Sequence, residues 1–201
     1  MFGKKTQKKE KPHKEEFELM RRKTSKSLLW IGIVSIIMLF SGLTSAYIVR
    51  ANNGNWLVFD LPDVMIISTG LIILSSLTMW MAQIAIKKDE KKKTSFYLLI
   101  TFILGICFIY TQYLGWKELT VQGIFFLGKY SNASGSFLYL IALLHIFHLL
   151  GGLISLLITW KNSRQNKYNS TDYLGVEMAA IYWHFIDVLW IYLFLFLYFF
   201  R

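Results

Sequence analysis

Five long apolar runs dominate the sequence and leave little room for any fold other than a helical membrane protein. They cover residues 27–49, 62–86, 94–116, 136–160 and 178–200 of a chain of 201 residues. Each run is long enough to cross a hydrocarbon core of roughly 30 Å, which takes about 20 apolar residues. Because a backbone in lipid must satisfy its own hydrogen bonds, each run is expected to be an α-helix. We therefore predict an all-α, polytopic bundle of five transmembrane helices without a separate soluble domain.

Basic residues are concentrated at alternate ends of these runs. The chain has 22 Lys and Arg against 12 Asp and Glu, a formal net charge of +10. Eighteen of the 22 fall in segments 1–26, 87–93 and 161–177, and the other four are Arg50, Lys117, Lys129 and Arg201. The positive-inside rule then predicts a cytoplasmic N-terminus and an outer C-terminus. The predicted organisation is a basic cytoplasmic segment, 1–26, followed by a transmembrane domain, 27–201.

The composition excludes several other classes of protein. Charged residues make up 17% of the chain, against about 25% in soluble domains. The single cysteine, Cys107, cannot form an internal disulfide. The basic excess comes without any nucleic-acid-binding module, so we interpret it as topological anchoring and contact with anionic lipid headgroups. The headgroup candidates before the first run are Arg21, Arg22, Lys23 and Lys26.

Four ionisable side chains of interest lie inside the predicted spans: His145, His148, His184 and Asp187. Such groups are costly in hydrocarbon and normally face a partner or a cavity. At a rise of about 1.5 Å per residue, Asp187 lies about 14 Å and His148 about 18 Å from the cytoplasmic side, which predicts a contact between them. We interpret the four, with Glu177 at the cytoplasmic edge, as a hydrogen-bonded polar clamp between helices.

The same histidines have alternative interpretations. His145 and His148 are three residues apart and share one helix face, as metal or haem ligands could. However, a structural metal takes four ligands, and haem in a bundle usually takes axial ligands from different helices. His184 lies only about 9 Å deep and His145 about 22 Å deep, so one compact site is hard to assemble. We therefore predict no metal in this chain, and a proton-linked or lipid-headgroup role stays open.

The fifth run begins with a distinctive segment, EMAAIYWHFIDVLW at residues 177–190. This segment resembles the last helix of subunit III of haem–copper terminal oxidases, the family of cytochrome c and quinol oxidases. Weaker similarities follow the family's order: HIFH at 145–148 with two glycines after it, the paired serines 75–76, and segment 38–47. Over about residues 28–200, the chain is similar to a five-span form of this subunit.

The resemblance implies a non-redox subunit without catalytic activity of its own. Haem and copper would belong to partner subunits I and II of a complex that reduces oxygen to water and pumps protons. Subunit III would pack on subunit I, support proton uptake and hold phospholipid in a V-shaped cleft between its first two shared helices and the rest. It also implies a place in the bacterial cytoplasmic membrane. Two glutamates of the family are replaced here by Ile36 and Gly115, so a proton role for those carboxylates does not carry over.

A different class of function competes with this interpretation. The histidines could instead serve a stand-alone membrane electron carrier that binds haem, or a small transporter. A carrier requires ligands at matching depth on different helices, and a transporter typically has broken helices near the midplane. Neither pattern is evident in the sequence.

Overall fold

All five predicted spans are helices in the computed structural model, which describes residues 7–52, 54, 56–128 and 131–200. Of residues 7–15 and 18 only the backbone is described, and Lys129, Arg201 and residues 1–6 of the charge count lie outside the described part. The helices are α1 (Gln7–Ala51), α2 (Val64–Lys87), α3 (Lys91–Val121), α4 (Ala133–Arg164) and α5 (Leu174–Phe199).

α1, α3 and α4 extend beyond both ends of their apolar runs because helical propensity does not stop at the edge of the hydrocarbon. α1 begins twenty residues before residue 27, in a stretch rich in Lys and Glu, which are good helix formers. At α4 the start is fixed by Asn132, whose side chain accepts a hydrogen bond from the Ser134 N–H, the usual way of satisfying a free helix amide.

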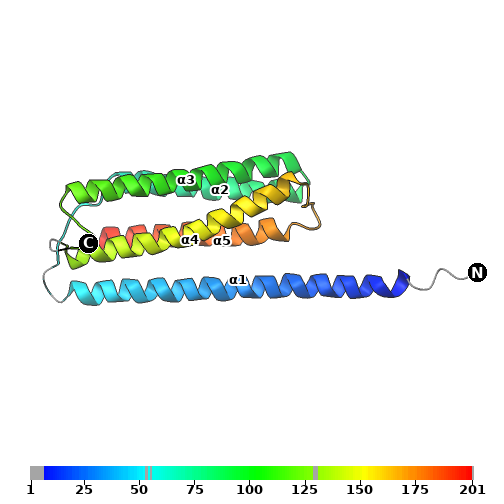
Figure 1. The fold of residues 1–201 in the computed structure, drawn as a ribbon, viewed down its shortest axis with the longest axis horizontal. Helices are drawn as coiled ribbons and strands as arrows, with labels where there is room; N and C mark the ends of the chain where they lie inside the picture. The colour runs from blue at the N-terminus through cyan, green and yellow to red at the C-terminus, as the bar shows by residue number, and fades with distance from the viewer. Residues whose placement is uncertain (1–6, 53, 55, 129–130, 201) are drawn as a thin grey trace, which may run out of the picture.

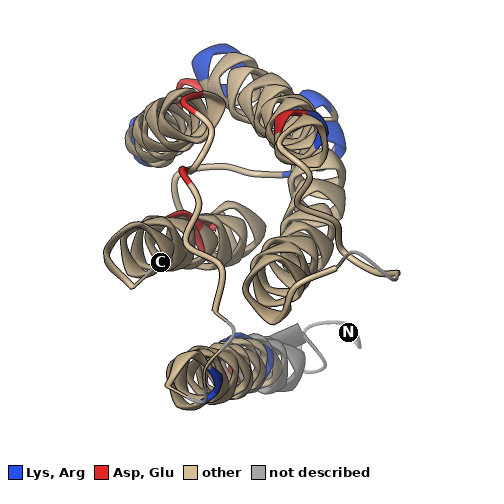
Figure 2. Ribbon diagram, turned by 90° about the vertical axis from the view of Figure 1, so that its left-hand side faces the viewer, with Lys and Arg blue, Asp and Glu red and all other residues tan. Residues whose placement is uncertain are grey.

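Four of the helices form a closed bundle, and α1 lies outside it (Figure 1). Along the chain α2 packs on α3, α3 on α4 and α4 on α5, and α5 returns to pack on α2. Viewed along the helices, α1 lies below this ring, and it contacts α4 and α5 (Figure 2). Within the described residues α1 makes no helix contact with α2 or α3.

This arrangement corrects one expectation. The first two spans do not form a unit separated from the other three by a V-shaped cleft, because α2 packs directly on α3 and α5 as part of the ring. The helix that stands apart is α1 alone. Half of the most apolar stretch of α5 is buried inside the chain, compared with 22% of the corresponding stretch of α1.

The centre of the bundle is built around Trp183 of α5, which is fully buried. Its indole N–H donates to Ser75 Oγ of α2 at 3.1 Å. The ring also fills the space left by two glycines. A Cβ atom on Gly105 of α3 would lie 2.8 Å from Trp183 Cη2, and one on Gly152 of α4 would lie 3.2 Å from Cε3. This side chain of α5 therefore contacts the other three helices of the ring, and small residues let the helices approach it, as is common in membranes.

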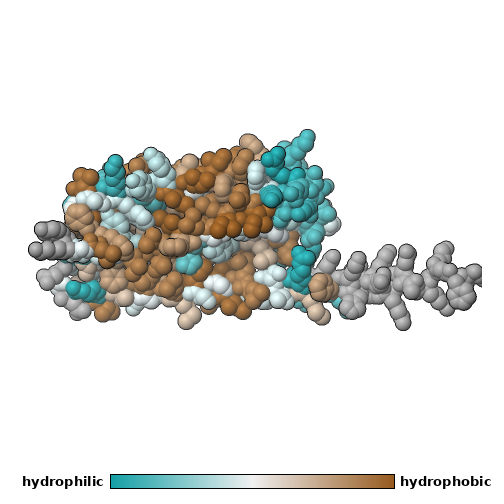
Figure 3. Space-filling view, viewed as in Figure 1, coloured by the Kyte–Doolittle hydropathy of each residue, from teal (hydrophilic) through white to brown (hydrophobic). Residues whose placement is uncertain are grey.

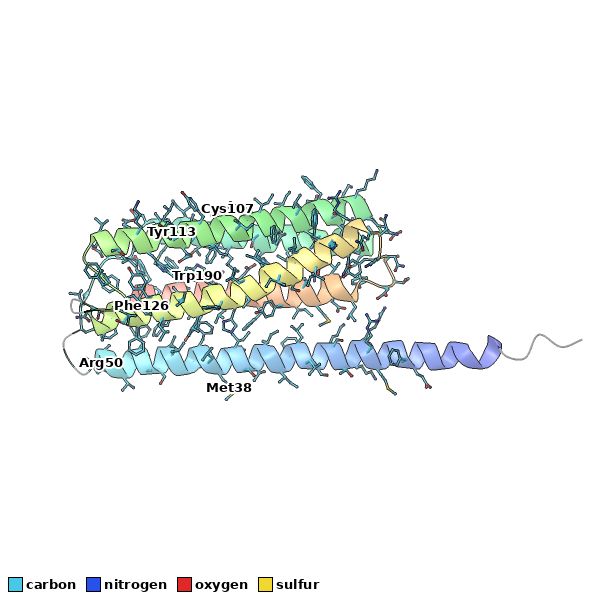
Figure 4. All side chains as sticks on the ribbon, viewed as in Figure 1. Met38, Arg50, Cys107, Tyr113, Phe126 and Trp190 are labelled. Atoms are coloured by element: carbon cyan, nitrogen blue, oxygen red, sulfur yellow. The ribbon has the colours of Figure 1, made fainter. Side chains whose placement is uncertain are left out.

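α1 packs through a single stripe of residues spaced by seven. Ile33, Phe40 and Tyr47 are each at most 3% exposed, whereas Met38 on the opposite face is 70% exposed and points away from the bundle (Figure 4). A seven-residue repeat of apolar contacts is typical of helices packed side by side at a small crossing angle. The outer face of α1 is therefore free for lipid or for another protein.

The surface of the molecule has the pattern of a membrane protein. On the face seen in Figure 3, a broad apolar belt covers the helices, and hydrophilic residues gather at the ends, most densely at the end where α5 begins. Large apolar side chains are exposed on every helix. In water so much exposed apolar area would favour aggregation, but in a bilayer it is the surface that faces lipid.

Candidate functional site

α1 and α5 run parallel and in register over most of their shared length. Both run in the same direction in Figure 1, starting at the end that is densely hydrophilic in Figure 3. Lys26 Nζ forms a 2.7 Å ion pair with Glu177 Oε1, and Thr44 Oγ1 lies 3.2 Å from the Tyr192 hydroxyl. Further along, the Tyr47 ring contacts Phe196 edge to face. The separation along the chain is 151 residues for the ion pair and 148 for the hydroxyl pair, so the register is nearly constant.

Several residues singled out from the sequence form ion pairs between α1 and the start of α5. Besides the pair of Lys26 with Glu177, Arg22 Nη2 forms a 3.0 Å ion pair with Asp172 and donates to the Thr171 carbonyl oxygen. Both cations were expected at lipid headgroups, and in the structure both also hold the start of α5 against α1. Arg21 and Lys23 are exposed and make no ion pair within the described residues. Headgroup contact stays a prediction for all four basic residues.

Exchanging the charges tests the α1–α5 register. We expect Lys26→Glu to lower the stability of the full chain in detergent by about 0.2–1 kcal/mol, the range for partly exposed ion pairs. The double variant Lys26→Glu/Glu177→Lys should recover most of the loss, because it restores the pair with reversed polarity. Thermal unfolding of the two variants and the wild type measures this. Equal losses in the single and double variants would contradict the register.

A second group of predicted residues meets on α2. His184 Nδ1 lies 2.7 Å from Ser76 Oγ, so α5 and α2 are joined by this hydrogen bond. Ser76 also interacts with Asp187, one turn along α5. Neither carboxylate oxygen of Asp187 has a hydrogen bond of ordinary geometry within the described residues, although the residue is only 2% exposed. Ser76, His184 and Asp187 thus form the polar group of the α2–α5 interface.

The histidines of α4 have different surroundings. His148 Nδ1 lies 2.7 Å from the Leu144 carbonyl oxygen of its own helix, and its ring contacts Phe40 of α1. His145 is fully buried, and its ring lies against Phe108 and Trp190. Neither ring nitrogen of His145 has a hydrogen-bond partner in the described structure. His145 therefore packs as an aromatic ring.

The single polar clamp predicted from the sequence is wrong in its geometry. No two of His145, His148, His184, Asp187 and Glu177 are hydrogen-bonded to each other among the described residues, and the expected Asp187–His148 bond is absent. The depth estimate fails because similar depth does not bring side chains together when their helix faces point to different neighbours. His184 faces α2, whereas His148 faces α1.

Most polar contacts between helices of the ring instead use the hydroxyl groups of α2, which join it to both of its neighbours. Gln112 of α3 donates to Ser68 of α2 at 2.7 Å and so joins the two helices. Such bonds contribute about 0.6 kcal/mol each in membrane proteins. The other pairs are Thr69 with Trp190, Ser75 with Trp183, Ser76 with His184 and Thr78 with Thr101.

The arrangement offers no assembled metal centre in the part of the chain that is described. No group of three or more His, Cys, Asp or Glu side chains there is placed to hold an ion. The intramembrane histidines lie in different places. His184 lies at the α2–α5 interface, His148 lies between α4 and α1, and His145 packs against Phe108 and Trp190. What the site can do chemically is to hold helices together through hydroxyl, imidazole and indole groups.

Comparison with known proteins gives this architecture a family. Residues 54–201, which contain α2 to α5, match the family model of cytochrome c oxidase subunit III. The chain belongs to the cytochrome c oxidase subunit III family. It is 31% identical over 178 residues to cytochrome c oxidase subunit 3 of Thermostichus vulcanus, covering 85% of this chain and 84% of that protein.

Other relatives of this chain are named as subunits of two kinds of oxidase. Cytochrome c oxidase subunit 3 of Synechocystis sp. is 30% identical over 181 residues, with 85% of this chain and 75% of that protein covered. Cytochrome bo(3) ubiquinol oxidase subunit 3 of Buchnera aphidicola is 27% identical over 175 residues, with 85% and 83% covered. The resemblance carried by residues 177–190 is thereby confirmed.

The structure also shows what occupies the two positions where this subunit III lacks a glutamate. Ile36 of α1 is partly buried and packs against the core. Gly115 of α3 is buried, and a Cβ atom there would lie 3.7 Å from Met65 Cγ of α2. Both positions are therefore filled by apolar packing.

Sequence reasoning missed several residues that hold this subunit together. Trp183 was one aromatic among many in the fifth run, and Gly105 was not singled out. The sequence around Gly105 does not indicate its importance, because the sequence of one helix does not show which aromatic ring of another helix will pack against it. The ion pairs were accessible, because Lys26 and Glu177 lie at the same membrane side when spans one and five run parallel.

Proposed function

We propose that this chain is the non-redox subunit III of a respiratory haem–copper oxidase in the bacterial cytoplasmic membrane. The observation that carries the proposal is the family match across the whole α2–α5 bundle. In that complex, subunits I and II hold the haems and copper, oxygen is reduced to water and protons are pumped. This chain packs on subunit I and supports the stability of the complex and its proton uptake.

The orientation follows from the charges. The chain places its N-terminus and the α2–α3 and α4–α5 connections in the cytoplasm, since segments 1–26, 87–93 and 161–177 carry eighteen of the 22 Lys and Arg residues. The histidines also support the non-redox role, because their hydrogen-bond and ring contacts lie in different parts of the bundle and do not bring their rings together at one site. Phospholipid fills the apolar surfaces that the helices leave exposed, with Arg21 and Lys23 at the headgroups.

Co-purification tests the proposal. An affinity-tagged chain, extracted from its own cells in a mild detergent, is expected to elute with a large partner that carries a haem Soret band. The chain separated from that partner should show no Soret band. A haem band retained by the isolated chain, in proportion to its amount, would support the stand-alone electron carrier and overturn the proposal.

The Asp187→Asn variant tests the supporting role. The buried carboxylate of Asp187 lies at the α2–α5 interface with Ser76 and His184. We expect this variant to shorten the active lifetime of the oxidase during turnover or to lower the yield of the complex. The haem spectrum of the complex that does assemble should be unchanged. The measurement is oxygen consumption against time, normalised to haem, and a loss of haem signal in the assembled complex would contradict a non-redox role.

A further inference from the structure

A basic cavity lies between α3 and α4 at the end of the bundle where most Lys and Arg residues are found. It has a volume of about 310 Å³ and opens to the surface. Its walls come from the first turns of α3 and the last turn of α4, which are antiparallel neighbours. The lining residues are Lys91, Lys92, Ser95, Ser163, Arg164 and Asn166.

The cavity has three cations and no carboxylate among its lining residues. Lys91, Lys92 and Arg164 form no ion pair with any described residue. The acidic groups nearest along the chain are engaged elsewhere. Glu90 forms a 3.0 Å ion pair with Lys93, and Asp89 Oδ1 accepts a hydrogen bond from the Ser170 amide. The positive charge of the cavity is therefore not neutralised by the protein itself.

The backbone at the cavity also favours an anion. α3 begins at Lys91, and the N–H groups of Lys92 and Lys93 donate to no described acceptor, as at any uncapped helix start. Free amides and the helix dipole at such an end attract phosphate groups. The opposing carbonyl groups at the end of α4 are occupied, because those of residues 161 to 163 accept the amides of the following turn.

The side of the cavity that faces the membrane suits an amphiphile. The guanidinium of Arg164 lies over the Trp160 ring, 5.2 Å from its centroid, which fixes the charge at the level of an interfacial tryptophan. Exposed apolar side chains follow on both helices toward the membrane interior, among them Phe96 on α3 and Leu157 on α4. A lipid with its headgroup at the cations has apolar surface available for its acyl chains.

We propose that this cavity binds the phosphate of an anionic phospholipid. Lys91, Lys92 and Arg164 neutralise the headgroup, the free amides of α3 and the hydroxyls of Ser95 and Ser163 donate hydrogen bonds to its phosphate oxygens, and the acyl chains lie on α3 and α4. Basic pockets between transmembrane helices at the cytoplasmic surface suit such headgroups. The site is distinct from the headgroup contacts of α1 and does not depend on membership in an oxidase.

Lipid binding to the purified full chain tests the proposal. The probes are phosphatidylglycerol, phosphatidylcholine and inorganic phosphate, each added to the delipidated chain in detergent and counted by native mass spectrometry. The cavity variant is Lys91→Gln/Lys92→Gln/Arg164→Gln. The control variant is Lys87→Gln/Lys88→Gln/Lys161→Gln, which removes the same charge from exposed positions outside the cavity.

We expect the wild type and the control variant to retain one phosphatidylglycerol molecule and to bind phosphatidylcholine more weakly. The cavity variant should bind phosphatidylglycerol about tenfold more weakly or worse, since each basic residue near a headgroup contributes substantially. Equal losses in both variants would show diffuse attraction and overturn the site. Equal retention of phosphatidylcholine would overturn its charge selectivity, and binding of inorganic phosphate as tight as that of the lipid would overturn the lipid as its ligand.

Discussion

Replacing Trp183 by alanine is expected to disrupt the α2–α5 bundle more than any other single substitution of an aromatic residue. The ring is fully buried, donates to Ser75 and packs against Gly105 and Gly152, so it contacts each of the other three ring helices. Removing a buried Trp costs about 3–5 kcal/mol in soluble proteins. We expect about 3 kcal/mol here, because association of helices in lipid gains from packing and hydrogen bonds and not from leaving water.

The measurement is thermal unfolding of the full chain in detergent, followed by its elution as a monodisperse species. Trp80→Ala is the matched control, since Trp80 belongs to α2 and is 54% exposed. Trp183→Phe should lie between the two, because it keeps an aromatic ring but loses the hydrogen bond to Ser75. If Trp183→Ala and Trp80→Ala unfold at the same temperature, the tryptophan is not the junction of the bundle.

The second large effect is expected for Gly105→Leu. A Cβ atom at Gly105 would lie 2.8 Å from Trp183 Cη2 and 2.9 Å from Leu153 Cδ2, both closer than non-bonded carbon atoms approach. The tryptophan cannot easily move away, since Gly152 contacts its other edge and Ser75 holds its nitrogen. Overpacking of a core costs about 1–3 kcal/mol and occasionally more. We expect the upper part of that range and a reduced yield of folded chain.

Gly32→Leu is the control for this variant, because nothing lies within 4 Å of a Cβ atom on Gly32 of α1. The double variant Gly105→Leu/Trp183→Leu provides a sharper test of mechanism. Trp183→Leu removes volume at the place where Gly105→Leu adds it, so the two losses should be less than additive. Strict additivity would mean that the two sites are not in contact.

Much of the fold was predictable because the membrane permits few alternatives. The length and apolar character of the five runs predict five helices, and their order of motifs predicts the family. The helix ends were predicted less well. α1 begins at Gln7 and not near residue 27, because a charged sequence with good helix formers continues the helix beyond the apolar run.

The candidate site was predictable in its residues but not in its connections. His184 and Asp187 do lie at one polar interface, but their shared neighbour is Ser76 of α2 and not a histidine of α4. Glu177 pairs with Lys26 of a helix 151 residues earlier. Depth in the membrane can be counted along a sequence, whereas the direction in which a helix face points depends on its rotation within the bundle.

The sequence by itself determined that this chain has five membrane helices, a strongly one-sided distribution of basic residues and the signature of subunit III. It did so because hydrocarbon excludes charge and unpaired backbone, and this restriction acts on each segment separately. Only the tertiary structure decided that α1 stands outside a ring of four, that Trp183 joins this ring, and that Lys91, Lys92 and Arg164 share a cavity. These features depend on which helix faces meet, and that choice is made by the fit of small residues, hydroxyls and rings across separate helices.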